Sequence, residues 1–216
     1  MSLEWIEAII HWVGGLLAYA ALGILLFGIW RGTRRPSGRT SGRATGWLRS
    51  ALFYILATAA FLGFSVFFWK PLPVQLSSPA RLACLAAGTL IYFPGLAFLL
   101  WARLTMGEMY FVSTSSGAQL YVGHKLVTRG PFAIVRHPMY LGLVTAALGS
   151  LLLYRTWTAL AFAIFAPFVL RRARHEEQAL AAEFGEQWQE YCRHVPAFIP
   201  RLRKERHDQS QRIPSH

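Results

Sequence analysis

Five apolar stretches constrain what this chain can fold into more than any other feature. The first, Ile9 to Trp30, contains no charged residue, and about 20 such residues suffice to cross a bilayer as a helix. The four others run over residues 51–69, 81–101, 139–154 and 157–170. The pattern predicts an all-α, polytopic membrane bundle of about five transmembrane helices, in which the last two form a tight hairpin.

The composition agrees with a membrane protein. Hydrophobic residues make up 54% of the chain and charged residues only 15%, whereas a soluble domain carries about 25% charged residues. Pro94-Gly95 and Pro167 lie inside two of the stretches and predict local irregularities in those helices. Cys84 lies in an apolar stretch and Cys192 in a charged tail, so we expect no disulfide.

The distribution of charge predicts the orientation. The net charge is +12, and the loop over residues 31–49 contains no acidic residue but six arginines: Arg31, Arg34, Arg35, Arg39, Arg43 and Arg49. By the positive-inside rule this loop is cytoplasmic, which places the N-terminus outside and the tail from residue 171 inside. Its Gly, Ser and Thr content predicts a flexible, solvated linker. The basic charge therefore does not require a nucleic-acid partner.

The segment over residues 103–138 is too long and too apolar to be a simple connector, and we expect it to fold against the membrane face. It leads into Arg136-His137-Pro138 at the start of the fourth stretch. Proline suits the first turn of a helix, and a helix N-terminus flanked by Arg and His favours an anionic ligand. The alternative is interfacial anchoring by long polar side chains. Glu108, in the same segment, has no evident partner.

The tail contains apolar residues at helical spacing, which predict one C-terminal amphipathic helix: Leu180, Phe184, Trp188 and Tyr191. Glu176 and Glu177 are adjacent carboxylates just beyond the last stretch, a pattern that suits a cationic or hydroxyl-rich ligand. The alternative is a solvated face with an Arg172–Glu176 pair at spacing i,i+4. No motif typical of a metal site, a nucleophile elbow or a phosphate-binding loop is present.

Four ordered motifs carry a resemblance to a known family. They are His124-x-Leu126-Val-Thr-x-Gly130-Pro-Phe, Arg136-His137-Pro138-x-Tyr140-x-Gly142, Glu176-Glu177-x-x-Leu180-x-x-x-Phe184-Gly185, and Tyr191 followed by Val195-Pro196. The set resembles the isoprenylcysteine carboxyl methyltransferase family, which includes phospholipid methyltransferases, over residues 85–202. The resemblance implies a membrane methyltransferase that uses S-adenosyl-L-methionine in a cytoplasmic pocket.

The resemblance also implies roles for individual residues. The cofactor would be held by His124, Leu126, Gly130, Arg136, His137, Tyr140, Gly142, Glu176 and Glu177. Arg172 and Glu176 are the expected catalytic residues, with Arg172 facing the acceptor. The acceptor is a membrane lipid or a lipophilic small molecule, whose reacting group (a prenylcysteine-like carboxylate, a lipid amine or a thiol) stays open. We expect it to enter from the bilayer near Pro94-Gly95.

The resemblance divides the chain into a two-span region (1–80), a methyltransferase core (81–202) and a frayed polar tail (203–216). If the chain is prokaryotic, its membrane is the plasma or inner membrane. Membrane sterol reductases share the Arg-His-Pro element and an ending like Trp188 to Pro196, so an NADPH-dependent reductase is an alternative. The Glu-Glu pair and Thr-x-Gly-Pro-Phe favour the methyltransferase. A non-catalytic membrane scaffold is a third hypothesis.

Overall fold

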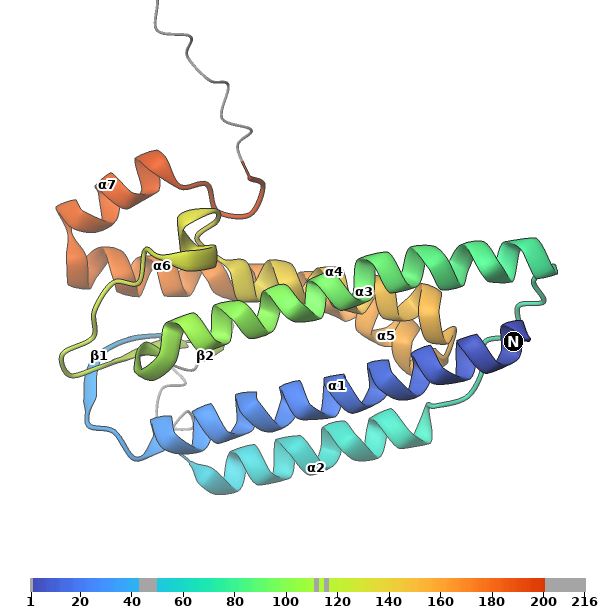
Figure 1. Ribbon diagram of the computed structural model, residues 1–216. Coiled ribbons are helices and arrows are strands. Elements are labelled where there is room, and N and C mark those ends of the chain that lie inside the picture. Colours follow the sequence, from blue (N-terminus) through green and yellow to red (C-terminus); the bar gives the residue numbers. More distant parts are fainter. Residues whose placement is uncertain (1, 43–49, 111–112, 115–116, 201–216) are drawn as a thin grey trace, which may run out of the picture.

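A computed structural model describes residues 2–42, 50–110, 113–114 and 117–200. Each of the five apolar stretches is helical, and most of these helices run along an elongated bundle (Figure 1). They are α1 (Leu3–Thr33), α2 (Ala51–Phe67), α3 (Ser78–Met106), α4 (Pro138–Tyr154) and α5 (Trp157–Phe165). The predicted helical architecture is therefore confirmed.

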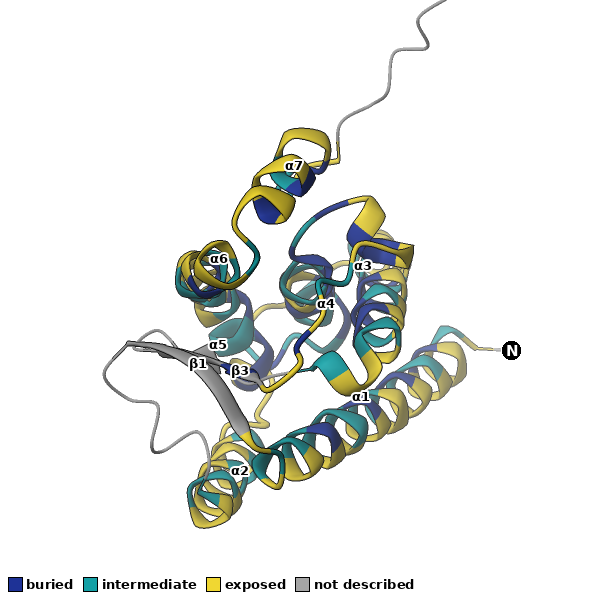
Figure 2. Cartoon of the chain, turned by 90° about the vertical axis from the view of Figure 1, so that its left-hand side faces the viewer, coloured by how far each residue is buried: buried dark blue, intermediate teal, exposed yellow. Residues whose placement is uncertain are grey.

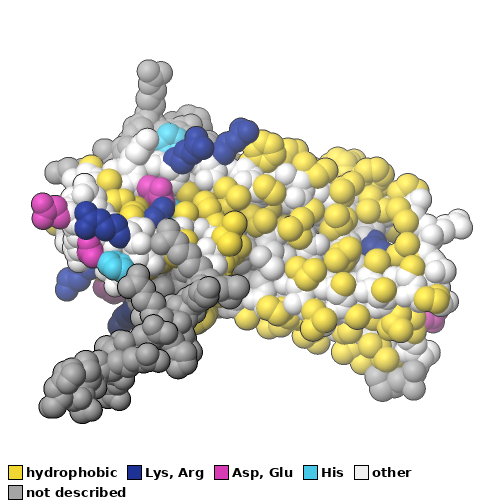
Figure 3. All heavy atoms as spheres, turned by 90° about the horizontal axis from the view of Figure 1, so that it is seen from above, with side chains coloured by type: hydrophobic (Ala, Val, Ile, Leu, Met, Phe, Trp, Pro, Cys, Tyr) yellow, Lys and Arg dark blue, Asp and Glu magenta, His cyan; other side chains and the backbone are white. Residues whose placement is uncertain are grey.

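The surface of the bundle is apolar over most of its length. Large side chains on α1 point outward, such as Trp12 at 75% exposure and Leu16 at 65%. The outer faces of α1 and α2 are largely exposed (Figure 2), and charged side chains gather at one end of the molecule (Figure 3). The helices α1 and α3 are long and apolar enough to cross a membrane. An exposed apolar surface of this extent needs lipid rather than water around it, so the chain is a membrane protein.

The contact between α3 and α4, the most extensive between two helices here, depends on glycine. A Cβ atom on Gly142 would lie 2.6 Å from the backbone nitrogen of Leu99, and one on Gly149 would lie 2.4 Å from that of Tyr92. Gly95 of α3 meets Ala146 of α4 in the same way. Small residues let membrane helices approach until their backbones touch. The helix α3 continues through Pro94, which lies within its bounds.

An ionic cluster closes the end of the bundle where the N-terminus lies. Glu7 of α1 is only 4% exposed and pairs with both Arg81 of α3 and Arg155 in the turn between α4 and α5. His11 of α1 bonds the carbonyl oxygen of Leu153 at 2.8 Å. A buried carboxylate is tolerated because two guanidinium groups compensate its lost hydration. The cluster joins three helices that are far apart in the sequence.

A small antiparallel sheet lies at the opposite end and packs against α6 (Leu170–Phe184). Its strands are β1 (Ser37–Gly42), β2 (Ser113–Thr114) and β3 (Gly117–Tyr121), in the order β1-β3-β2. No strand pattern in the sequence predicts this sheet. The expectation of a flexible, solvated linker was wrong for residues 37–42, because β3 supplies a partner for their backbone hydrogen bonds. The rest of that linker, residues 43–49, lies outside the described residues.

The tail forms two helices instead of the single helix predicted. A 3-10 turn, η4 (Ala166–Val169), contains Pro167 and leads from α5 into α6. Gly185, at φ +50°, then ends α6 and turns the chain into α7 (Glu186–His194). Glycine adopts this backbone conformation at little cost, which explains the break. The predicted frayed tail, residues 203–216, lies outside the described residues.

Candidate active site

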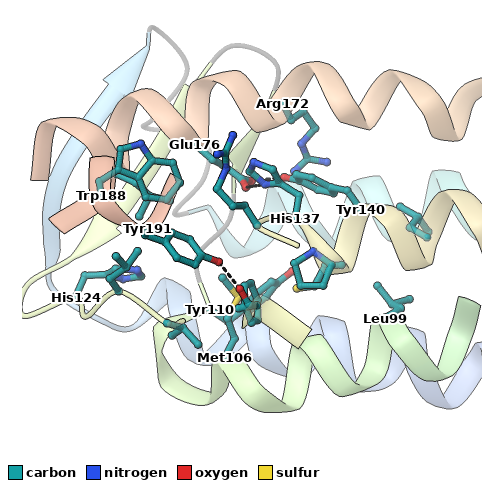
Figure 4. A pocket seen from close by; sticks show the side chains of 18 of the residues that line it. Leu99, Met106, Tyr110, His124, His137, Tyr140, Arg172, Glu176, Trp188 and Tyr191 are labelled. Atoms are coloured by element: carbon teal, nitrogen blue, oxygen red, sulfur yellow. Dashed lines mark hydrogen bonds and ion pairs between the residues drawn. The ribbon is translucent and has the colours of Figure 1, made fainter. Parts of the chain in front are cut away.

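A pocket with a cavity volume of about 230 Å³ lies at the end of the bundle that carries α6 and α7. Its polar lining residues come from the loop before α4, from the first turn of α4 and from α6: His124, Arg136, His137, Tyr140, Arg172 and Glu176. The remaining wall is mainly apolar and includes Leu25 of α1, Leu99 of α3 and Trp188 of α7. Helices from both halves of the chain therefore build one cavity (Figure 4).

The loop before α4 is held in place by the segment that follows α7. The backbone nitrogen of Arg136 donates to the carbonyl oxygen of Pro196 at 2.8 Å, and that of His137 donates to Ala197 at 3.1 Å. The hydroxyl of Tyr191 donates to the carbonyl oxygen of Phe132 at 2.6 Å. These bonds fix the backbone just before α4, and so they fix the positions from which Arg136 and His137 line the pocket.

Glu177 contacts both side chains that directly precede α4, Arg136 and His137. Its Oε1 lies 2.9 Å from Nη2 of Arg136 and accepts a hydrogen bond from Nε2 of His137 at 3.0 Å. The hydrogen bond from His137 lowers the pKa of Glu177, and Arg136 acts in the same direction against the opposing effect of burial. Glu177 itself is not among the pocket-lining residues. It therefore positions Arg136 and His137 from behind.

The second carboxylate faces the pocket. The hydroxyl of Tyr140 donates to Glu176, and Nδ1 of His137 lies 3.8 Å from the same carboxylate. Arg172, one turn earlier on α6, holds its guanidinium 5.9 Å from the centre of the Tyr140 ring (Figure 4). Its Nε is buried and has no hydrogen-bond partner within the described part of the chain. Desolvating a polar group without a partner is costly, so this atom marks a place for a ligand acceptor.

His124 provides a neutral polar group on the opposite wall. It is 9% exposed, and burial lowers its pKa to about 4. The imidazole is therefore uncharged near pH 7 and can both donate and accept a hydrogen bond. Leu126 lies beside it in the lining and packs with the cluster formed by Trp188, Tyr191 and Val195.

The structure places seven of the predicted site residues in the pocket lining: His124, Leu126, Arg136, His137, Tyr140, Arg172 and Glu176. Three are not in that lining. Glu177 lies behind Arg136, Gly142 packs against α3, and Gly130, at φ +60°, begins the 3-10 turn η3 (Gly130–Ala133). The close backbone approach at Gly142 and the positive φ of Gly130 therefore explain why both positions are glycine.

Sequence reasoning missed the contributions of α1 and of the end of α3 to the pocket. Leu25, Leu99, Met106 and Tyr110 all line it. Leu25 and Leu99 lie in stretches where nearly every residue is apolar, so no signal distinguishes the side that faces a cavity. The expectation that Glu108 has no partner is wrong, because Glu108 pairs with Arg31 at 3.3 Å and with Arg35 at 3.0 Å. That partnership depends on α1 and α3 ending at the same level.

Comparison with known proteins finds a family match over part of this chain. The isoprenylcysteine carboxyl methyltransferase family matches residues 88–182, a segment that contains the loop before α4, α4 itself and most of α6. The predicted resemblance is thereby confirmed for this segment.

Individual relatives show the same partial overlap. Protein-S-isoprenylcysteine O-methyltransferase B of Arabidopsis thaliana is 39% identical over 79 residues, which are 36% of this chain and 40% of that protein. Cobalt-zinc-cadmium resistance protein CzcN of Cupriavidus metallidurans is 38% identical over 103 residues, 45% of this chain and 44% of that protein. Methanethiol S-methyltransferase 2 of Bradyrhizobium diazoefficiens is 35% identical over 83 residues, 38% of this chain and 32% of that protein. The chain thus spans less than half the length of these relatives.

Among solved structures, the eukaryotic intramembrane Ras methyltransferase is similar at 24% identity and a TM-score of 0.45. The alignment covers 69% of this chain and 53% of that one.

Proposed function

From the match of residues 88–182 to the isoprenylcysteine carboxyl methyltransferase family, we propose that this chain transfers a methyl group from S-adenosyl-L-methionine to a lipophilic acceptor. The observation that carries the proposal is Arg172, which lines the pocket beside Glu176 and whose buried Nε has no hydrogen-bond partner among the described residues. A guanidinium placed in this way suits an anionic group on a ligand.

The pocket residues fit the chemistry of this methyl donor. When bound, it supplies an electrophilic methyl group on a sulfonium cation. Glu176 is placed to meet ammonium or ribose hydroxyl groups, and Arg136 with His137 can hold a carboxylate at the start of α4. The faces of Tyr140 and Trp188 can attract the sulfonium charge. The neutral His124 is suited to a hydrogen bond with an uncharged base.

Little acid–base chemistry is required of the chain if the acceptor is a carboxylate, because that group is already ionised near pH 7. The task of the pocket is then to align the reactants and to exclude water. We propose that Arg172 holds the anionic end of the acceptor. A thiol or an amine would first have to lose a proton, for which Glu176 is the nearby carboxylate in the lining. The charge of Arg172 favours the carboxylate.

The apolar lining indicates how such an acceptor reaches the pocket. Leu25 of α1, Leu99 of α3 and Leu143 of α4 extend the wall toward the apolar body of the bundle. The contacts of Gly95 do not favour the predicted entry near Pro94-Gly95, because a Cβ on Gly95 would lie only 2.6 Å from the backbone of Ala146. The α3–α4 contact therefore closes that side. We propose entry from the side of α1 instead.

The proposal includes a topology. Five spans would place the N-terminus outside and the pocket in the cytoplasm, in agreement with the arginines at the end of α1. We retain a two-span region over 1–80 and a core over 81–202. The contacts give the first region a part in the site, since Leu25 lines the pocket and β1 pairs with β3.

The first test is calorimetric titration of the purified chain in detergent with S-adenosylhomocysteine, with NADPH in parallel. We expect binding of S-adenosylhomocysteine alone, with a micromolar Kd. Binding of NADPH alone would replace the proposal with the reductase alternative. Binding of neither by a folded sample would favour the non-catalytic scaffold. A screen of prenylcysteine carboxylates, lipid amines and thiols as methyl acceptors would follow.

A further inference from the structure

A second cavity, of about 570 Å³, lies between α1 and α3 on the other side of Tyr110. We call it the α1–α3 groove. Its apolar part is formed by Gly23, Ile24 and Phe27 of α1 with Leu104 of α3. Its charged part follows directly along the same helices, where α1 and α3 end. Apart from Tyr110, none of the residues that line the candidate active site lines this groove.

The charged part of the groove has an excess of positive charge. Arg31, Arg35 and Arg103 line it together with one acidic residue, Glu108. Glu108 is shared, since its Oε1 lies 3.3 Å from Nη2 of Arg31 and 3.0 Å from Nη2 of Arg35. One carboxylate cannot offset three guanidinium groups, so the groove is complementary to an anion.

Arg103 makes this charge a fixed part of the groove. It is 8% exposed and holds its guanidinium 4.3 Å from the centre of the Tyr110 ring. A Cβ on Gly28 would collide with the same guanidinium, so α1 approaches Arg103 only because a glycine is there. The cation is thus held at the floor of the groove.

An apolar wall that is followed by a cluster of arginines is complementary to an amphiphile at the membrane surface. The guanidinium of Arg34 lies 4.0 Å from the centre of the Trp30 ring, and both residue types are typical of the membrane–water boundary. A water-soluble anion would make no contact with the apolar wall, and an uncharged lipid would not pair with the arginines. Basic residues at this level attract anionic lipids. We propose that the α1–α3 groove binds an anionic phospholipid, with its phosphate at Arg31, Arg35 and Arg103 and one acyl chain along Gly23 and Phe27.

The groove also touches the candidate active site, because Tyr110 lines both cavities. A lipid in the groove would therefore lie against the wall of the pocket. The proposal concerns lipid binding only and stands whether or not the chain is a methyltransferase.

The test titrates the full chain in detergent with phosphatidylglycerol, using phosphatidylcholine with the same acyl chains as the neutral control. Native mass spectrometry measures the bound fraction. We expect phosphatidylglycerol to bind about tenfold or more tightly than phosphatidylcholine. The double variant Arg31→Gln/Arg35→Gln should lose this preference. The matched control is Arg34→Gln, at the residue that caps the end of α1 and lies outside the groove lining, and it should keep the preference.

A second pair of variants tests the apolar part without removing any charge. A Cβ on Gly23 meets no atom within 4 Å, and the same is true of Gly15 in the same helix. Gly23→Leu should fill the groove and weaken phosphatidylglycerol binding about tenfold, whereas Gly15→Leu should leave it within about twofold. Thermal unfolding without added lipid checks that both variants fold.

Three outcomes would overturn the proposal. Equal affinity for the two lipids would show that charge plays no part. Equal effects of the groove variants and their controls would place the lipid elsewhere. Complete competition by an equal concentration of inorganic phosphate would identify a simple anion site rather than a lipid site.

Discussion

One carboxylate oxygen joins two neighbouring side chains at the start of α4: Oε1 of Glu177 lies 2.9 Å from Nη2 of Arg136 and 3.0 Å from Nε2 of His137. The three residues come from segments about forty positions apart. The contact holds α6 against the loop before α4. A second contact between α4 and α6 comes from the hydroxyl of Tyr140, which donates to Glu176. These two contacts hold α6 against the start of α4, and residues from both segments form the polar wall of the pocket.

Replacing Glu177 by Gln should lower the stability of the chain and weaken ligand binding, although it changes no residue that lines the pocket. The isosteric amide loses the ion pair with Arg136, which is partly buried, and we expect about 1–2 kcal/mol of lost stability. We also expect at least about tenfold weaker binding of S-adenosylhomocysteine, because Arg136 and His137 are no longer held. Thermal unfolding and calorimetry measure the two effects. Glu186→Gln on α7 serves as the control. Unchanged ligand binding in Glu177→Gln would show that Glu177 does not position Arg136 and His137.

Arg172→Gln should separate turnover from cofactor binding. If Arg172 holds the acceptor, the variant should bind S-adenosylhomocysteine within about threefold of the parent. Its kcat should fall by about 10²-fold, as expected for the loss of one charged group that acts at the reacting end. Steady-state kinetics with a prenylcysteine carboxylate would measure this. A loss of S-adenosylhomocysteine affinity of comparable size would instead assign Arg172 to the cofactor.

The stability of the chain should depend on pH through His124. Its pKa in the folded state is about 4, below the ordinary 6.5, so the unfolded chain takes up a proton first as the pH falls. This stability is complete above about pH 6.5 and decreases down to about pH 4, by up to about 3 kcal/mol. Comparing the Tm of the parent and His124→Gln between pH 7 and 4.5 isolates the contribution, with the exposed His194→Gln as control. Parallel pH profiles for all three would refute it.

Glu177 acts in a different pH range. Its pKa is lowered by the hydrogen bond from His137, so the stability it provides is present above its ordinary value of 4.5 and is lost only as the pH falls further. The two groups can therefore be told apart by the pH at which each variant departs from the parent.

Gly142→Ala tests whether this glycine serves helix packing or the cofactor. Because the added Cβ would lie 2.6 Å from the backbone of Leu99, we expect a loss of about 1–3 kcal/mol from overpacking. Gly63→Ala on α2 meets no neighbouring atom and should be nearly neutral. Thermal unfolding measures both variants. An unchanged Tm combined with lost S-adenosylhomocysteine binding would restore Gly142 to the cofactor site.

The sequence alone determined the helices, the membrane character and the family resemblance. Each of these depends on local composition or on short ordered motifs, and the apolar length of α1 or the Arg136-His137-Pro138 element can be recognised without knowing any contact. Seven of the ten predicted site residues line the pocket for the same reason.

Only the tertiary structure decided which side of an apolar helix faces a cavity and which strand partners the arginine-rich loop. Leu25 cannot be distinguished from its apolar neighbours until α1 packs beside α3, and β1 forms only because β3 supplies hydrogen bonds across a wide sequence separation. Glu177 and Gly142 show the same limit, since a motif identifies a residue but not the direction in which it acts. Those directions follow from contacts between distant segments, which local sequence does not encode.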